Sequence, residues 1–167
     1  ISAAAPTLFL FDDDKAGRGA ARKLTKAPMN APAQHQGATF VWTLPRTDEF
    51  KLFMRRRGLQ HDQAFFTAEF LFPVNDAAAL CLELTEGRDD EEISSWRVQI
   101  NGDYWPGIGQ AAYMQLQSAE PGSADWFYAR GVPPNLKAVF AQTALERAFD
   151  LSAIDFVART VRDVLHV

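Results

Sequence analysis

Several residue types are scarce in this chain, and their scarcity excludes whole classes of site. The one cysteine, Cys81, cannot form a disulfide within the chain, and its Ala and Leu neighbours predict a buried, inert thiol. The three histidines, His35, His61 and His166, are far apart and have no Cys or His neighbour at metal-ligand spacing. The sequence therefore predicts no zinc site.

Long apolar runs are also missing. No stretch approaches the ~20 apolar residues of a membrane span, and the first residues lack the basic-then-apolar profile of a signal peptide. We therefore expect a cytoplasmic protein without a membrane partner. There is no P-loop, no serine nucleophile elbow and no dinucleotide-type glycine fingerprint.

What remains is ordinary globular material. The 167 residues are 47% apolar, 12% aromatic and 23% charged, which suffices for one hydrophobic core. The four tryptophans are expected in that core rather than stacked on bases: Trp42, Trp96, Trp105 and Trp126. Ile1 opens the chain without a methionine and a strand-like run follows at once, so we expect a piece of a longer polypeptide.

The charge is unevenly distributed along the chain. Residues 1–57 carry ten Lys or Arg and five acids, whereas residues 58–167 carry seven and sixteen, which gives the net charge of −4. This distribution argues against a uniform nucleic-acid-binding coat, but it is compatible with a local basic patch that faces phosphates. Ordinary solvated surface is the alternative.

The first 45 residues predict a strand, a helix and a second strand. The run 7–11 is apolar and suits a strand buried on both faces, and 16–24 places small residues on one helical face. A loop is expected at 28–37, and a second strand at 38–44, ended by Pro45. This order indicates a right-handed βαβ unit and an α/β fold with a parallel sheet.

The later segments carry weaker signals. A short basic helix or loop is predicted at 48–59, an apolar segment around Glu69 at 65–72, a helix at 77–84 and a solvated acidic loop at 89–92. A strand is predicted at 97–100, followed by a tight turn at Asn101-Gly102 that leads to Tyr104 and Trp105, and residues 113–116 are expected to pack in the core. Two helices are expected to close the chain, one at 137–149 and one from Ser152, where Asp155 completes a capping box. The chain shows no repeat and no clear interdomain linker.

Three aspartates directly follow the first strand. In an extended chain Asp12 and Asp14 point to one side and Asp13 to the other. Two neighbouring carboxylates repel unless a cation lies between them, and Mg²⁺ binds through one or two carboxylates with water and substrate phosphate as further ligands. Ligands of open α/β sheets bind beyond the carboxyl ends of strands. The alternative is that Asp13 or Asp14 only caps the following helix.

This segment resembles the second acidic motif of the Toprim domain. The resemblance is carried by the apolar strand, the pair Asp12-x-Asp14, and the small residues Gly17 and Ala20-Ala21. It implies that Asp12 and Asp14 help to bind a catalytic Mg²⁺ or Mn²⁺ and that Gly17 lets the next helix pack closely. Toprim domains begin with a strand that carries a glutamate, so the resemblance implies an upstream half of the domain and an isolated chain that lacks full activity.

A wider similarity points to the C-terminal part of OLD-like nucleases, which follow an ATPase domain in phage-defence and DNA-processing proteins. It rests on Leu44-Pro45, the run 66–73 containing Glu69-Phe70-Leu71-Phe72-Pro73, Lys137-Ala138-Val139-Phe140-Ala141 and a final helix bearing Phe156. It implies Glu69 beside the metal and Lys137 in phosphate chemistry, within a Toprim-like half at 1–75 and an α/β-to-helical extension at 76–167.

The resulting expectation is a metal-dependent DNA nuclease. Its site would hold the metal on Asp12, Asp14 and Glu69, with Lys137 also catalytic. Binding to backbone phosphates is expected from Lys15, Arg18, Arg22, Arg46, Arg55 and Arg56, supported by Lys23, Lys26, Lys51 and Arg57. The expected partners are DNA and an ATPase domain, and a homo-oligomer is compatible with the sequence.

Two other functions remain open. A haloacid-dehalogenase-type phosphatase also places Asp-x-Asp after an apolar strand, with the first aspartate as nucleophile, although Lys15 stands where that family expects Thr or Val. A non-catalytic interaction module would use the aspartates only to cap a helix and the basic residues to dock nucleic acid or a protein subunit.

Overall fold

The computed structural model describes residues 5–25, 31–60, 64–101, 105 and 107–166. Its strands are β1 (Thr7–Phe11), β2 (Ala33–Gln36) and β3 (Thr39–Thr43). Its helices are α1 (Lys15–Leu24), α2 (Asp48–Arg56), α3 (Val74–Thr85), α4 (Glu91–Val98), α5 (Gln110–Gln117), α6 (Ala124–Arg130), α7 (Lys137–Glu146) and α8 (Ser152–Leu165), with 3₁₀ turns η2 (Ala68–Leu71) and η4 (Pro134–Leu136). No helix in the described part of the chain is both long and apolar enough to cross a bilayer.

The chain divides into two units. Unit 1 combines three separate segments, Ile1–Arg46, Phe65–Ala68 and Ser152–Val167, and unit 2 comprises Thr47–Ala64 and Glu69–Leu151. The boundary expected after residue 75 falls inside unit 2. Each unit is therefore described by itself.

Unit 1 contains a small mixed sheet in the order β1-β3-β2. β1 and β3 are parallel, with Thr7 opposite Thr39 and Phe11 opposite Thr43. The connection between these two parallel strands contains α1, as expected for a βαβ unit. β2 pairs with β3 in the antiparallel sense. The α/β class is confirmed. The expectation of a purely parallel sheet is wrong, because residues 33–36 of the expected loop form a strand; residues 28–30 of that loop lie outside the described part.

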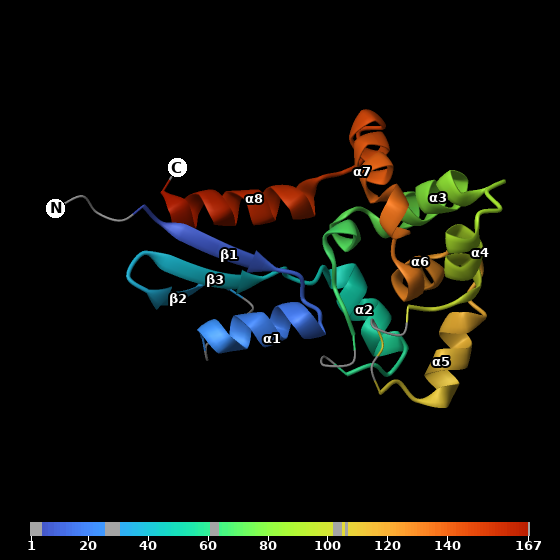
Figure 1. Cartoon of the computed structure of the whole chain (residues 1–167), viewed down its shortest axis with the longest axis horizontal. Helices are drawn as coiled ribbons and strands as arrows, with labels where there is room; N and C mark the ends of the chain where they lie inside the picture. Colours follow the sequence, from blue (N-terminus) through green and yellow to red (C-terminus); the bar gives the residue numbers. More distant parts are fainter. Residues whose placement is uncertain (1–4, 26–30, 61–63, 102–104, 106, 167) are drawn as a thin grey trace. The chain divides into compact units, whose positions relative to one another are not determined.

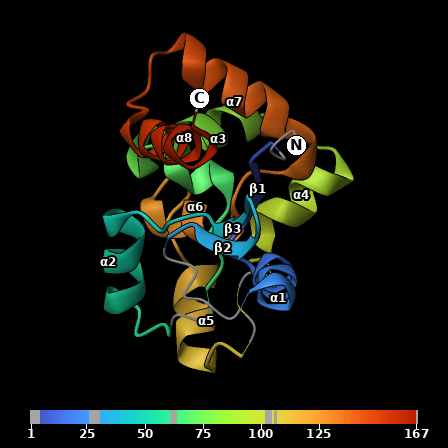
Figure 2. The same cartoon turned by 90° about the vertical axis from the view of Figure 1, so that its left-hand side faces the viewer.

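β1 lies at the edge of this sheet, with α8 along one side of the sheet and α1 on the other (Figures 1 and 2). Phe9 and Leu10 are 44% and 40% exposed. The expected burial of this strand on both faces is therefore wrong, since β3 is its one strand neighbour among the described residues.

α1 begins where its sequence predicts. Asp14 is the N-cap, and its carboxylate accepts a hydrogen bond from the Gly17 N–H at 2.5 Å. Ala21 is fully buried, and a Cβ on Gly17 would lie 2.1 Å from the carbonyl oxygen of Asp12. Small residues thus allow α1 to pack closely on the strand that precedes it, as predicted.

Unit 2 is helical and has an aromatic centre. Phe50 and Phe53 of α2 lie with their ring centroids 4.9 Å from that of Tyr128 in α6, and Phe70 stacks at 5.7 Å on Phe50. α6 itself lies against α3 and α5 (Figure 1). The residues of α6 from Trp126 to Arg130 are all buried. This helix, absent from the sequence-based expectations, is the core element of the unit.

Some expected elements of unit 2 are confirmed and others are wrong. Helices at α2, α3, α7 and, in unit 1, α8 occur where predicted. The strand expected at 97–100 is wrong, because residues 91–98 form α4, with Asp90 as its N-cap accepting from the Ile93 N–H at 3.0 Å. Glu91 and Glu92 are exposed, as expected, but they form the first turn of that helix rather than a loop. Gly102 and Tyr104 of the expected hairpin lie outside the described residues.

Cys81 and three of the four tryptophans are confirmed in the core, whereas Trp96 is half-buried and the packing expected at 113–116 is confirmed for Leu116 alone. Cys81 is 1% exposed, and burial raises the pKa of its thiol from 9.0 to about 12, as expected of an inert thiol. Trp42, Trp105 and Trp126 are at most 2% exposed, and Trp96 stands edge-on to Trp126 at 5.1 Å. Of residues 113–116, Leu116 is fully buried, whereas Tyr113 and Met114 are exposed.

Candidate functional site

The three aspartates leave β1 in an extended conformation. The Asp13 N–H donates to the Phe66 carbonyl at 2.9 Å, and the Phe66 N–H donates to the Asp13 carbonyl at 3.1 Å. Asp14 has φ −114° and ψ 178°. Because side chains alternate in extended backbone, Asp13 faces one side of this segment and Asp12 and Asp14 face the other.

Asp13 lies in a buried cluster with two arginines. Arg18 Nη1 donates to Asp13 Oδ1 at 2.9 Å and to the Asp13 carbonyl at 2.9 Å, and Arg46 Nε donates to Asp13 Oδ2 at 2.5 Å. The three residues are at most 8% exposed. Both carboxylate oxygens of Asp13 are therefore engaged, and this side chain links α1, the segment after β3 and the end of β1.

The charges of this cluster do not cancel. Burial lowers the pKa of the Arg46 guanidinium, the charge and hydrogen bond of Asp13 oppose that shift, and the charge of Arg18 adds to it. The guanidinium of Arg18 also lies over the Phe65 ring, 5.9 Å from its centroid. The cluster of Asp13, Arg18 and Arg46 therefore carries one net positive charge, on the side of the segment opposite Asp12 and Asp14.

Asp12 and Asp14 have different surroundings. Asp12 is exposed, and Asp14 is half-buried, with one carboxylate oxygen occupied as the cap of α1. A Cβ on Gly17 would lie 2.1 Å from the Asp12 carbonyl and 3.1 Å from Asp14 Oδ1. The absence of a Cβ at Gly17 thus lets the first turn of α1 lie directly against the Asp12 backbone and the capping carboxylate of Asp14.

A buried hydroxyl lies on the strand segment opposite these aspartates. Thr67 is 4% exposed, and its Oγ1 has no hydrogen-bond partner among the described residues. Continuing the pairing of Asp13 with Phe66 by one residue brings Thr67 alongside Asp12. Within the described residues, no group of three or more Asp, Glu, His or Cys side chains is arranged to hold a metal. The segment after β1 therefore offers two carboxylates, those of Asp12 and Asp14, and neutral oxygens as metal donors.

Glu69 and Lys137, which the sequence analysis assigns to one site, form an ion pair within unit 2. Lys137 Nζ lies 2.5 Å from Glu69 Oε1, and the Glu69 side chain is 12% exposed. The pair joins η2 to the first residue of α7. Asp12 and Asp14 belong to unit 1, so the assembly of all four residues into one site stays a prediction.

The predicted phosphate-binding residues separate into two groups. Arg18 and Arg46 are buried against Asp13, whereas Lys15 and Arg22 are exposed on α1. Seven residues apart, Lys15 and Arg22 share one face of that helix. Arg55 and Arg56 are exposed at the end of α2 in unit 2, and Lys26 lies outside the described residues. Arg18 and Arg46 thus already have a buried carboxylate partner, and the phosphate contacts expected of them stay a prediction.

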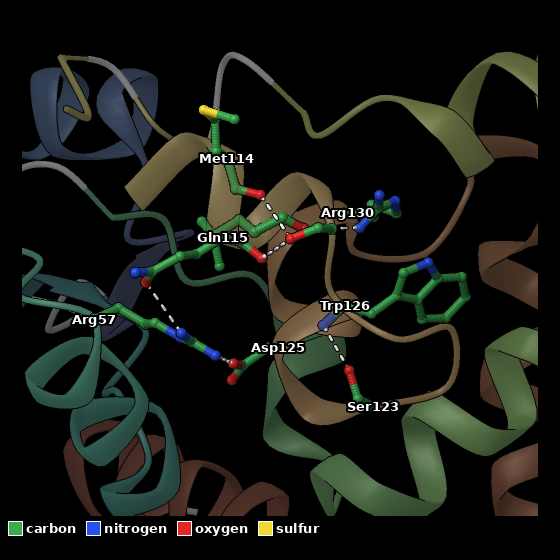
Figure 3. A network of polar contacts seen from close by, with 9 residues as sticks. Arg57, Met114, Gln115, Ser123, Asp125, Trp126 and Arg130 are labelled. Atoms are coloured by element: carbon green, nitrogen blue, oxygen red, sulfur yellow. Dashed lines mark hydrogen bonds and ion pairs between the residues drawn. The ribbon is translucent and has the colours of Figure 1, made fainter. Parts of the chain in front are cut away.

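Polar contacts in unit 2 that sequence reasoning missed surround α6 (Figure 3). Arg57 pairs with Asp125 and donates to Gln115 Oε1 at 3.1 Å, and Ser123 caps α6 by accepting from the Trp126 N–H at 3.2 Å. The Asp125 partner could not be inferred because it lies 68 residues from Arg57. The cap of α6 could have been predicted, because Ser123 precedes the aromatic run Trp126-Phe127-Tyr128 at the spacing of an N-cap.

Arg130 is the second polar feature that sequence reasoning missed. It is 3% exposed and donates to the carbonyls of Arg97, Leu116 and Gln117 at 3.1, 3.5 and 3.3 Å. These carbonyls belong to the last turns of α4 and α5. Burial lowers the pKa of Arg130, and the charge of Tyr113 opposes this shift. The guanidinium thus joins two helix C-termini, where the helix dipoles favour a cation.

Comparison of the chain with protein-family models, with curated proteins and with solved structures finds no match. The functional argument therefore rests on the residues and their geometry.

Proposed function

We propose that this chain belongs to a metal-dependent nuclease of the Toprim, OLD-like type, which hydrolyses phosphodiester bonds in DNA. The observation that carries the proposal is the extended segment at the carboxyl end of β1, where Asp13 turns into the buried arginine cluster and Asp12 and Asp14 face away from it. This end of a parallel strand is the usual ligand position in α/β folds.

The donor set suits a hard divalent cation. Asp12, Asp14 and the hydroxyl of Thr67 are oxygen ligands, and Mg²⁺ accepts one or two protein carboxylates when water and phosphate fill its other positions. When bound, such an ion polarises a phosphate oxygen and lowers the pKa of water. The role of Gly17 in this proposal is to let α1 begin close to the Asp12 backbone, which keeps the Asp14 carboxylate at the helix cap next to Asp12 in the chain.

The remaining residues of unit 1 orient the site and attract the substrate. The contacts of Asp13 with Arg18 and Arg46 fix the backbone between the two ligands, and Asp14 is oriented by the Gly17 N–H. The exposed Lys15 and Arg22 lie on one face of α1 and would hold backbone phosphates without reading base sequence.

Metal binding by single-charge variants tests the proposal. Asp14→Asn keeps a residue that caps helices as well as Asp does but removes one negative ligand, and Asp12→Asn removes the other. We expect each variant to weaken Mn²⁺ binding, followed by electron paramagnetic resonance, at least about tenfold. In a longer protein that includes the upstream half, each should also abolish Mg²⁺-dependent nicking of supercoiled DNA. Asp48→Asn, an exposed acid at the start of α2, is the control. Mn²⁺ binding that is equal in all of these proteins would overturn the assignment.

A second candidate is a non-catalytic interaction module. This candidate is favoured because two of the three aspartates have structural roles that need no metal. Asp13 pairs with the two buried arginines, and Asp14 caps α1. A ligand that binds the native state raises its melting temperature. The nuclease proposal expects such a rise with millimolar Mg²⁺, lost in Asp12→Asn, whereas the interaction module expects none.

A further inference from the structure

The outer edge of β1 carries unused backbone hydrogen-bonding groups. The Thr7 N–H donates to the Ala38 carbonyl, and the Phe11 carbonyl accepts from the Leu44 N–H, so odd-numbered residues of β1 face β3. Because alternate residues of a strand hydrogen-bond to opposite sides, the N–H and C=O groups of Leu8 and Leu10 point to the outer edge. No strand in the described part of the chain pairs with that edge.

This edge lacks the features that protect exposed strands. β1 reads Thr-Leu-Phe-Leu-Phe, without a charge, a proline or a bulge within it, and Phe9 and Leu10 are 44% and 40% exposed. Natural proteins usually cover such edges or place lysine, proline or a bulge in them. An open, apolar edge of this kind is a surface for strand addition.

We propose that β1 pairs in the antiparallel sense with β1 of a second copy of this chain, with a two-fold axis at Phe9. In this register each Leu8 lies opposite Leu10 of the second copy, and both backbone groups of each are used, as in a hydrogen-bonded antiparallel pair. Phe9 of one copy lies opposite Phe9 of the second copy at a non-hydrogen-bonded position, where the side chains of the two strands are closest. A register centred on Leu8 would place Leu10 opposite Pro6, which has no N–H, and one centred on Leu10 would bring the two aspartate clusters closer together.

Charge also favours the two-fold arrangement. Antiparallel pairing about Phe9 places Asp12 opposite Pro6 of the second copy, so the two aspartate clusters lie at opposite ends of the paired strands. Parallel pairing would instead align the clusters side by side and bring like charges together. The pairing is isologous, which means that both copies contribute the same surface. The three-stranded sheet of one copy and that of the second copy then form one continuous sheet.

Disulfide trapping tests the register. Cβ atoms at a non-hydrogen-bonded pair lie within reach of a disulfide, so Phe9→Cys should give a covalent dimer under mild oxidation. The native Cys81 is buried and does not compete. Leu10→Cys, which lies opposite Leu8 rather than itself, and Leu52→Cys, 47% exposed on α2, are matched controls. We expect cross-linking of Phe9→Cys to be at least about tenfold faster than that of either control.

The oligomeric state provides the second measurement. Because one strand pair is a small interface, we expect a dimer in sedimentation equilibrium with a Kd between about 10 µM and 1 mM. Phe9→Lys places two like charges together at the axis and should raise this Kd at least about tenfold, while Leu52→Lys leaves it unchanged. Circular dichroism shows whether each variant keeps its fold.

Three outcomes would overturn the proposal. The first is a chain that stays monomeric at millimolar concentration with Phe9→Cys cross-linking no faster than Leu52→Cys. The second is a dimer that Phe9→Lys leaves intact, which would place the interface elsewhere. The third is protection of the Leu8 and Leu10 amides from hydrogen exchange in a monomer, which would show that another segment of the protein covers the edge.

Discussion

Asp13 is the residue on which unit 1 depends most directly. Its carboxylate is buried, and it provides the negative charge beside the buried guanidinium groups of Arg18 and Arg46. Removing one member of a buried ion pair leaves an uncompensated charge in a poorly solvated place. The cluster therefore makes folding sensitive to this one aspartate.

We expect Asp13→Ala to lower the free energy of unfolding by about 3–5 kcal/mol, measured by urea denaturation. Asp48→Ala, which removes the exposed partner of Lys51, should leave the midpoint nearly unchanged. An Asp13→Ala protein as stable as the wild type would show that the arginines do not need this carboxylate.

Two glycines of α1 give a matched pair. Gly17→Ala should destabilise the protein by about 1–3 kcal/mol, because the new Cβ meets the Asp12 carbonyl and the backbone must shift. Gly19→Ala has no atom within 4 Å of its Cβ and should stabilise α1 by about 0.5–1 kcal/mol. Thermal unfolding measures both, and effects of the same sign would contradict the close approach of α1 to β1.

At the scale of elements, Arg130 joins the C-terminal turns of α4 and α5. We expect Arg130→Met to cost about 2 kcal/mol or more, since buried carbonyls lose charged donors. Arg147→Met, which removes an exposed pair with Glu83, is the control and should leave the unfolding midpoint nearly unchanged. Equal midpoints for the two variants would mean that water replaces Arg130 at these carbonyls.

The sequence predicted those elements whose signals are local. The βαβ order, the cap at Asp14 and the helices α2, α3, α7 and α8 follow from apolar periodicity and capping residues. β2 was missed because Ala33–Gln36 is polar and owes its conformation to pairing with β3. α4 was missed because Arg97-Val98-Gln99-Ile100 alternates like a strand, whereas the cap at Asp90 begins a helix.

The candidate site shows the same limit at longer range. Asp12 and Asp14 could be proposed from the order of residues after one strand, and their roles as ligands stay predictions. The pairing of Asp13 with Arg46, 33 residues away, could not be inferred, and it gives a structural partner to one of the arginines expected to bind phosphate. Distant partners are set by tertiary packing, which a single sequence does not reveal.

At the scale of the whole molecule, Cys81 is a reporter of opening in unit 2. Burial raises the pKa of its thiol to about 12, so at pH 8 the folded protein holds almost no thiolate. We expect a thiol reagent to label Cys81 only through unfolding, with a labelling rate that rises with the urea concentration. Rapid labelling without denaturant would contradict the burial.

The same thiol should make stability depend on pH. Because the Cys81 thiol of the unfolded chain titrates near 9.0, deprotonation of the unfolded state should lower the free energy of unfolding as the pH rises above that value.

The discontinuous course of unit 1 has a consequence for its biosynthesis. β1 leaves the ribosome before the other elements described here, but α8, which lies along it, is translated more than a hundred residues later, after every segment of unit 2. Nascent β1 must therefore wait with Phe9 and Leu10 uncovered, while unit 2 can already complete its own aromatic centre. Chaperone depletion, ribosome stalling before α8 and synonymous codon changes in the region that encodes α8 should accordingly disturb the folding of unit 1 more than that of unit 2.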